Sequence, residues 1–190
     1  EHYKSVGRYN AKVDPIVTTL PNNRAEITLQ IDEDDTAKLR SVTFNGNEAI
    51  SSSKLQEQME LQPDSWWKLW GNKFDGSQFD KDIQAIQDYY QNNGYAKARV
   101  TKTDVQLNEE HTKADVTIDV SEGEKYNLSS ARIVGNLGGM ADELQPLLGE
   151  LHLNDTFSRA DVQNVESLIK DKLGERGYGS ATVNTVPTFD

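Results

Sequence analysis

The sequence predicts an α+β protein built from tandem copies of one small unit, and three observations lead to this prediction. First, a helix-closing Gly recurs at Gly7, Gly94 and Gly177, each followed four residues later by Ala and six residues later by Val. Second, apolar and polar residues alternate after the first two glycines, as in half-buried strands. Third, apolar residues precede Gly94 and Gly177 at the same distances of 15, 8 and 4 residues, which is helical spacing. The glycines lie 94 − 7 = 87 and 177 − 94 = 83 residues apart, which indicates small domains rather than solenoid repeats of roughly 20–50 residues.

Composition excludes several classes of function. The chain has 190 residues and a formal net charge of −11, which argues against non-specific binding to nucleic acids and to anionic membrane surfaces. It has no cysteine, so disulfides and thiolate chemistry are excluded. No apolar run approaches the ~20 residues that a membrane-spanning helix needs. Because the chain starts without Met inside a periodic pattern, we expect it to be a piece of a longer protein.

The first unit, residues 1–36, holds the trailing part of one copy. Gly7 closes the tail of a helix, since Gly commonly takes the left-handed position after a helix. Strands are predicted over residues 11–19 and 25–31, with a turn containing Pro-Asn-Asn between them. The second strand alternates cleanly, with its inward set made of Ala25, Ile27, Leu29 and Ile31.

The middle unit, residues 37–124, is the complete copy. A strand over residues 39–44 leads into an Asn-Gly-Asn stop. Ser53 is expected to open a short helix through a capping box, and Pro63 to end it. A second helix starts near Ser77 and carries one apolar stripe, made of Phe79, Ile83, Ile86 and Tyr90. After Gly94 two strands follow, and the last one turns three side chains inward, Val116, Ile118 and Val120.

The third unit, residues 125–190, repeats this order and stops before its last strand. Residues 131–136 parallel the first strand of the middle unit and its Gly-Asn end. A helix over residues 141–148 contains Pro146, which predicts a distorted or early-ending helix. Ser158 is expected to cap the second helix, whose apolar positions are Val162, Val165, Ile169 and Leu173. Each unit therefore follows the order strand, helix, helix, strand, strand.

These features resemble POTRA domains, the polypeptide-transport-associated repeats of outer-membrane β-barrel assembly proteins. The resemblance rests on the order of elements, on the strand that ends in Gly-Asn and on the helix-closing Gly-Tyr. The middle unit is most similar to the third POTRA of the BamA family, through residues 63–67, 88–96 and 116–123. The flanking pieces resemble the end of the second POTRA and most of the fourth.

The resemblance implies a three-stranded mixed sheet in each unit, covered by two antiparallel helices, with the last strand in the centre. It also implies an exposed edge along the second strand, which in the middle unit is about residues 99–107. An open edge offers unpaired N–H and C=O groups to another strand. In the BamA family this edge of the third POTRA receives the BamB lipoprotein. Carried over by position, the partner-binding residues are Thr101, Thr103, Val105 and Leu107, while Lys102 and Asp104 face the other way.

The sequence of this strand leaves two interpretations open. Lys97, Arg99 and Lys102 protect the beginning of the strand from promiscuous pairing, whereas Val105 and Leu107 leave an apolar end. Either these two apolar side chains meet a partner at the edge, or they face the core of their own unit.

Nothing in the sequence predicts an enzyme, a cofactor or a metal site. His2, His111 and His152 are isolated and lack metal-ligand spacing, and no nucleophile has a base nearby in sequence. A Trp-rich cluster at residues 66–70 is the remaining feature, and Trp side chains dominate interface energies. Trp66 is expected to be buried and Trp70 to be the surface aromatic.

The resemblance implies a non-enzymatic scaffold of the outer-membrane protein assembly machinery, located in the periplasm of a Gram-negative envelope. Its expected partners are a BamB-like lipoprotein and unfolded outer-membrane protein strands, bound by β-augmentation, and not nucleic acid. The parent protein is expected to carry a β-barrel, whereas this fragment does not span the membrane. A POTRA array of another transporter, such as two-partner secretion, and a passive spacer stay open as alternatives. The truncated end units are also expected to exchange strands between molecules.

Overall fold

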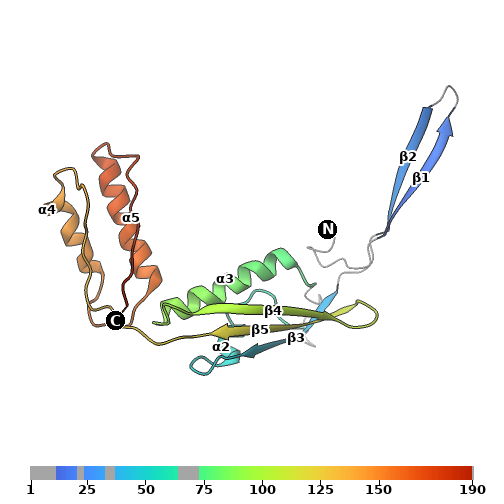
Figure 1. Ribbon diagram of the computed structural model, residues 1–190, viewed down its shortest axis with the longest axis horizontal. Helices are drawn as coiled ribbons and strands as arrows, with labels where there is room; N and C mark the ends of the chain where they lie inside the picture. Colours follow the sequence, from blue (N-terminus) through green and yellow to red (C-terminus); the bar gives the residue numbers. More distant parts are fainter. Residues whose placement is uncertain (1–11, 21–23, 33–36, 64–72, 190) are drawn as a thin grey trace. The chain divides into compact units, whose positions relative to one another are not determined.

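The computed structural model describes residues 12–20, 24–32, 37–63 and 73–189 (Figure 1). It divides into two compact units. Unit 1 comprises residues 1–86 and 99–121, and unit 2 comprises residues 87–98 and 122–190. The domain boundaries expected from the sequence, residues 1–36, 37–124 and 125–190, stay a prediction.

An antiparallel hairpin forms the first described part of unit 1. Strand β1 (Lys12–Leu20) pairs with β2 (Arg24–Asp32), and the register places Val17 opposite Ile27. The two strands lie within one residue of the ranges predicted from the alternating pattern. The sequence signal was sufficient here because apolar and polar residues alternate in the second strand and a Pro-Asn-Asn segment, typical of turns, separates the two strands in the sequence.

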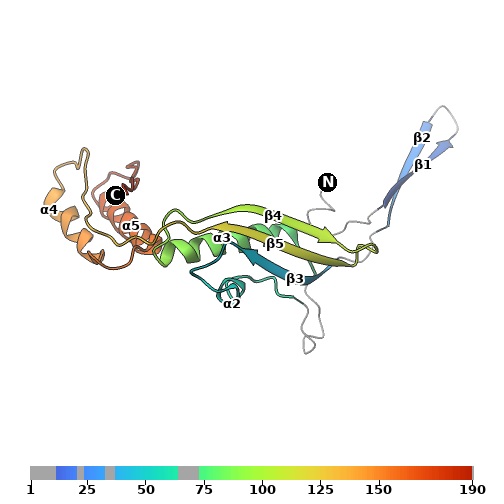
Figure 2. The ribbon, with the colours of Figure 1, turned by 60° about the horizontal axis from the view of Figure 1, so that its bottom comes forward.

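Unit 1 also contains a three-stranded mixed sheet. Its order is β3 (Lys38–Asn45), β5 (Lys113–Ser121) and β4 (Arg99–Leu107), so that the last strand in the chain is central (Figure 2). Strand β5 runs parallel to β3 and antiparallel to β4. The α+β fold class and the mixed three-stranded sheet implied by the resemblance are therefore confirmed.

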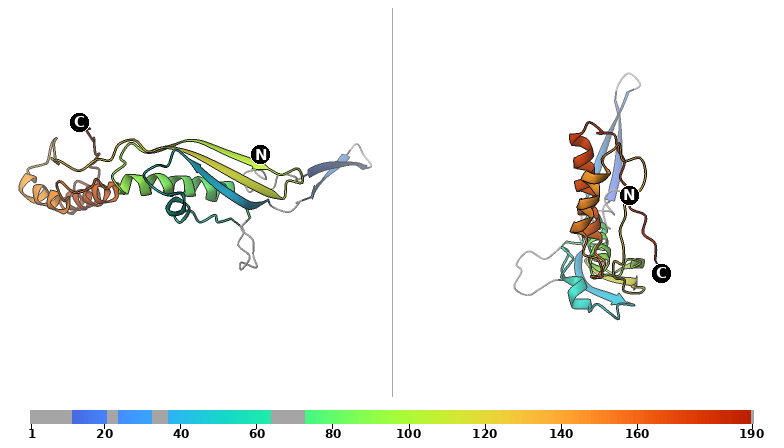
Figure 3. Two further views of the ribbon diagram at one scale, coloured as in Figure 1. Left: turned by 90° about the horizontal axis from the view of Figure 1, so that it is seen from below. Right: turned by 90° about the vertical axis from the view of Figure 1, so that its left-hand side faces the viewer.

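Two helices cover one face of this sheet, as the left view of Figure 3 shows. Helix α3 (Gly76–Asn92) starts beside Asp75, whose carboxylate accepts hydrogen bonds from the Ser77 and Gln78 N–H groups at 2.8 and 3.3 Å. Helix α2 (Ser52–Gln56) is shorter than expected and has Ser51 at its N-cap, without a side-chain capping bond. The predicted capping box at Ser53 was wrong, because that residue already lies inside the helix.

The core of unit 1 forms between the sheet and these helices. The predicted inward residues of β5, Val116, Ile118 and Val120, are buried, and so are Phe79 and Ile86 from the stripe of α3. Asp82 is the one buried charged residue among the described positions, at 2% exposure. Its carboxylate accepts from the Glu60 N–H at 2.9 Å, the Leu61 N–H at 3.0 Å and the Gln78 side chain at 3.1 Å. This carboxylate therefore fixes the segment that follows α2.

Unit 2 contains a second helical core. Helix α4 (Ala141–Leu144) passes into the 3-10 helix η1 (Gln145–Glu150), with a Pro in its first turn, so the predicted early end of this helix is confirmed. Helix α5 (Arg159–Glu175) is capped by the Ser158 hydroxyl, which accepts from the Asp161 N–H at 3.3 Å. The helices enclose one apolar cluster, consisting of Met140, Leu144, Leu151, Val165 and Ile169.

The strand expected at residues 131–134 is not formed. Ile133 still packs against the apolar cluster of unit 2, but its backbone joins no ladder. In the middle unit the equivalent strand, β3, pairs with the central strand, β5. The described residues of unit 2 contain no strand in that position, so an extended segment has nothing with which to pair.

The last turns of α3 are part of unit 2. Tyr90 is fully buried, and its hydroxyl donates to Glu122 at 2.8 Å. Burial and this carboxylate raise the Tyr90 pKa well above its usual value. The Asn92 side chain accepts from the Ala160 N–H at 2.9 Å, at the start of α5. Hydrogen bonds therefore connect the end of α3 to Glu122 and to the start of α5.

Candidate partner-binding edge

Strand β4 is an edge strand of the sheet. It pairs with β5 on one side, and among the residues that the structure describes no strand pairs with its other side. An edge of this kind presents a row of backbone groups to which another strand can add. The sequence-predicted contact residues, Thr101, Thr103, Val105 and Leu107, all lie on β4.

The register of β4 shows where its side chains point. Thr103, Val105 and Leu107 lie opposite Ile118, Val116 and Ala114, which are fully or almost fully buried. Residues directly opposite each other share a face of the sheet, so these three β4 side chains point to the helix-covered face. Val105 and Leu107 are half-buried there. They therefore line the rim of their own core and leave apolar surface beside the open edge.

The other face of β4 is polar. The side chains of Lys102, Asp104 and Gln106 share this face. The β5 residues opposite them alternate along the strand with the buried residues of β5, and successive side chains of a strand point to opposite faces. Gln106 donates to the Asp104 carboxylate at 2.8 Å. The sheet thus has an apolar, helix-covered side and a polar side, and β4 carries both to the edge.

Two hydrogen bonds fix which backbone groups face outward. The Asn108 N–H donates to the Lys113 carbonyl at 3.0 Å, and the Lys38 N–H donates to the Thr112 carbonyl at 2.8 Å. Hydrogen-bonded and non-hydrogen-bonded pairs alternate along an antiparallel ladder. The pair of Asn108 and Lys113 is hydrogen-bonded, so the next such pairs involve Asp104 and Gln106.

It follows that the N–H and C=O groups of three intervening residues, Thr103, Val105 and Leu107, point away from β5. These are the groups that an added strand would use. The apolar side chains and the outward backbone groups come from the same residues. A strand that pairs here would therefore place alternate side chains over the rim of the core.

Thr101 differs from the other three residues. The register skips between Val100 and Lys102, so Thr101 sits in a bulge. Its hydroxyl donates to the Asp119 carbonyl at 3.1 Å, across the bulge. Regular pairing therefore extends from Lys102 to Leu107, and Thr103 is the first of these residues whose backbone groups point outward. The bulge could not be predicted from the sequence, because neither Gly nor Pro marks it.

A cluster of charged and polar side chains lies on β3 and β5, on the open face of the sheet. The Arg40 guanidinium pairs with the Asp115 carboxylate, with its Nε at 2.8 Å from Oδ1. The Ser41 hydroxyl donates to the same carboxylate at 2.5 Å. The hydrogen bonds from Arg40 and Ser41 lower the Asp115 pKa to about 2. This group stabilises the pairing of β3 with β5.

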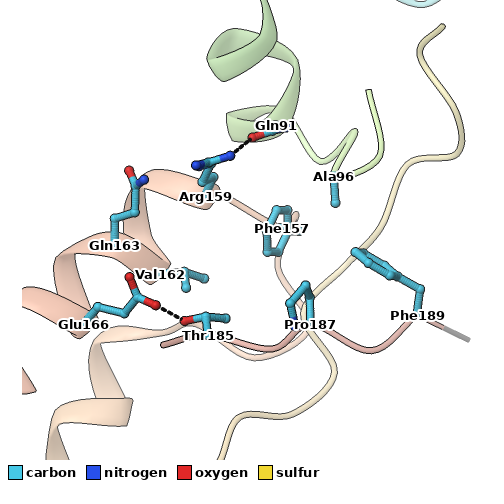
Figure 4. Close-up of a pocket in the computed structure, with 10 residues that line it drawn as sticks. All are labelled: Gln91, Ala96, Phe157, Arg159, Val162, Gln163, Glu166, Thr185, Pro187 and Phe189. Atoms are coloured by element: carbon cyan, nitrogen blue, oxygen red, sulfur yellow. Dashed lines mark hydrogen bonds between the residues drawn. The ribbon is translucent and has the colours of Figure 1, made fainter. Parts of the chain in front are cut away.

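Unit 2 contains a cavity of about 300 Å³ (Figure 4). Its walls combine aromatic and aliphatic side chains, among them Phe157, Pro187 and Phe189, with polar ones. Arg159 donates to Gln91 at 2.7 Å, and Thr185 donates to Glu166. These two hydrogen bonds fix polar side chains at the wall of the cavity.

The remaining candidates are spread over the chain. His111 lies in the turn between β4 and β5, and His152 lies in unit 2. The described residues hold no group of three side chains suited to a metal ion. Within the same residues no helix is long and apolar enough to cross a membrane. Trp66 and Trp70 lie outside the described residues.

Comparison with known proteins identifies the family. The family model described as "POTRA: Surface antigen variable number repeat" matches residues 37–123 and 126–190. The outer membrane protein assembly factor BamA of Neisseria meningitidis serogroup B is 33% identical over 191 residues, which cover 98% of this chain and 24% of that protein. BamA of Buchnera aphidicola is 27% identical over 192 residues, which cover 100% of this chain and 31% of that protein. The chain thus spans about a quarter to a third of these relatives.

A solved structure gives the same result. The crystal structure of Haemophilus influenzae BamA POTRA3-5 is 74% identical in sequence and has a TM-score of 0.73. The match covers 81% of this chain and 61% of that one. Fold and sequence therefore agree, and the resemblance to BamA repeats is confirmed: the chain belongs to the POTRA family.

Proposed function

We propose that this chain is a non-enzymatic scaffold of the outer-membrane protein assembly machinery, and that it binds strands at the β4 edge. The open edge of β4, with outward backbone groups at Thr103, Val105 and Leu107, is the observation that carries this proposal. The relatives named as outer membrane protein assembly factors support the cellular role. They favour this role over that of a secretion transporter or a passive spacer.

The expected location follows from the same relatives. BamA is named as an outer membrane protein assembly factor, and this supports a periplasmic position for the POTRA repeats of such a protein. The proposed partners are other components of the assembly complex, in particular a BamB-like lipoprotein, together with unfolded outer-membrane protein strands. The chain covers only 24% of its Neisseria relative. A role in outer-membrane protein assembly, which is that of the full-length relative, is therefore part of what we propose for this chain.

Binding by β-augmentation needs no chemical step. Backbone hydrogen bonds from the edge supply sequence-independent affinity, and alternate side chains of the added strand supply specificity. Each net hydrogen bond contributes roughly 0.5–1.5 kcal/mol, so three residues with outward groups give a modest affinity by themselves. Burial of the exposed parts of Val105 and Leu107 adds an apolar contribution. A scaffold that must release its substrates is served by affinity of this size.

The test uses Leu107→Pro. The Leu107 N–H points away from β5, so Pro at this position removes a donor from the open edge without removing a bond of the sheet. Leu107→Ala is the matched control, because it truncates the same side chain and keeps the N–H. We expect Leu107→Pro to abolish binding of the BamB-like lipoprotein and Leu107→Ala to weaken it only in part.

The measurement is titration calorimetry with the purified lipoprotein, together with hydrogen exchange on β4. Circular dichroism confirms that both variants are folded. In the wild-type chain the amide of Val105 should become protected from exchange when the lipoprotein binds. Unchanged affinity in folded Leu107→Pro would refute binding at this edge.

A further inference from the structure

We infer that the β4 edge accepts an antiparallel strand in one charge-ordered orientation, with carboxylates at the C-terminal end of the added strand. This inference rests on the proposed function, and it adds the direction, length and chemistry of the ligand. It arises from an asymmetry along β4. The strand begins at cationic side chains and ends at an acidic turn, in a chain whose net charge is −11.

The cationic end consists of Arg99 and Lys102. Both side chains are exposed, and in the part of the chain that the structure describes neither makes an ion pair. Lys97, the third cation of this region, is engaged elsewhere, since its ammonium lies 5.0 Å from the centre of the Tyr126 ring and 4.6 Å from that of Phe189. Two cations are thus available beside the edge.

The acidic end is the turn after Leu107. Glu109 and Glu110 are exposed there, and the Asn108 side chain donates to Glu110 at 2.7 Å. The Asn108 carboxamide oxygen also accepts from the Thr112 and Lys113 N–H groups at 2.9 and 2.7 Å. These bonds hold the turn in a fixed shape, so its carboxylates stay at one end of β4. An added strand therefore meets opposite charges at its two ends.

The bulge sets the length of the added strand. Regular pairing begins after Thr101, because a bulge interrupts the ladder. Lys102 to Leu107 remain, and the outward backbone groups lie between Thr103 and Leu107. At ~3.3 Å per residue these five residues span roughly 15 Å. Three of them offer outward backbone groups. The ligand should therefore pair through five residues that alternate apolar and polar, with apolar side chains opposite Thr103, Val105 and Leu107.

Antiparallel pairing is slightly more stable per residue than parallel pairing. In that direction the N-terminus of the added strand lies near Glu109 and its C-terminus lies near Lys102. An added strand with basic residues before its paired segment and acidic residues after it then places opposite charges beside Glu109 and beside Lys102. The structure assigns to this edge an amphipathic strand with that order of charges.

The test compares two blocked nine-residue peptides of the same composition. The first has two lysines, then Val-Thr-Val-Thr-Val, then two aspartates. The second has the lysines and aspartates exchanged. Exposed ion pairs are worth a few tenths of a kcal/mol to 1 kcal/mol each, so we expect the first peptide to bind about three- to thirtyfold more tightly at low salt. The preference should shrink at high salt, because such charges are screened.

A charge-reversal variant completes the experiment. Arg99→Glu with Lys102→Glu should abolish the preference, because both ends of β4 are then acidic and each peptide meets one end of matching and one end of opposing charge. The control Lys54→Glu with Lys81→Glu, on the helices, should keep it. Equal affinity of both peptides, with both lost in Leu107→Pro, would overturn the charge-ordered orientation and leave strand binding at the edge intact. If neither peptide protects β4 amides from exchange, the proposed function falls together with this inference.

Discussion

Substitution of Gly46 tests whether close packing of β3 against the central strand β5 stabilises unit 1. Gly46 follows β3 with φ of 80°, and a Cβ at this position would lie closer than 3.0 Å to the Val120 carbonyl oxygen of β5. Gly135 is its sequence equivalent in unit 2. It has φ of 117°, and a Cβ there would meet no atom within 4 Å. Substitution of Gly135 therefore tests backbone strain alone, whereas substitution of Gly46 tests strain together with a steric clash.

The expected effects differ for this reason. Gly46→Ala adds backbone strain of about 1–2 kcal/mol, and the clash pushes the ends of β3 and β5 apart. Loss of one or two ladder bonds and of nearby packing adds about 2–3 kcal/mol, for a total of roughly 3–5 kcal/mol. Gly135→Ala retains only the strain, which is about 1–3 kcal/mol for this backbone region.

Hydrogen exchange with mass spectrometry measures both variants locally. Residues 114–120 report on β5 and residues 162–172 on α5, so each substitution is judged by the opening free energy of its own unit. A loss of stability at Gly46→Ala that is no greater than that at Gly135→Ala would refute the argument, because it would show that the carbonyl of Val120 can move at no cost.

Two further predictions concern side chains of unit 1. Asp82→Ala leaves the backbone N–H groups of residues 60 and 61 without their acceptor and should destabilise unit 1 by about 2–4 kcal/mol in urea titrations. The control Asp80→Ala, on the exposed side of the same helix, should change the stability little. Equal effects of the two substitutions would contradict the structural role of Asp82. Asp115 has a pKa of about 2 in the folded chain, below its ordinary value of 3.8, so the stability from its pairing with Arg40 is present above that ordinary value and is lost as the pH falls through 2. Asp115→Asn should remove this component from the acid-unfolding curve, and a curve identical to that of the wild type would exclude it.

The elements of the repeat could be predicted from the sequence because each has a local signal. The apolar stripe of α3, the alternation in β5 and the effect of Pro146 depend on neighbours a few residues away. The capping box at Ser53 was wrong for the same reason, since a favourable pattern does not show which Ser begins the helix. The missing ladder at residues 131–134 was harder to foresee, because a strand exists only when a second strand pairs with it.

The candidate site was predicted only in part. The four residues of the edge were chosen by position in the family, and they stay a proposal. The sequence could not decide whether Val105 and Leu107 face the core or a partner. The register of β4 shows that the two alternatives do not exclude each other. Their side chains point to the rim of the core, while their backbone groups point to the open edge. One residue can therefore serve both the fold and a partner.

By itself, then, the sequence determined the repeating order of strands and helices, the acidic charge of the chain and the polarity of charge along β4. These properties follow from residue type and spacing, which are fixed along the chain. Only the tertiary structure decided which backbone groups are left unpaired and where the bulge at Thr101 ends regular pairing. The physical reason is that every residue type except proline carries the same backbone donor and acceptor, so the direction of these hydrogen bonds is set by which strands come together and in what register.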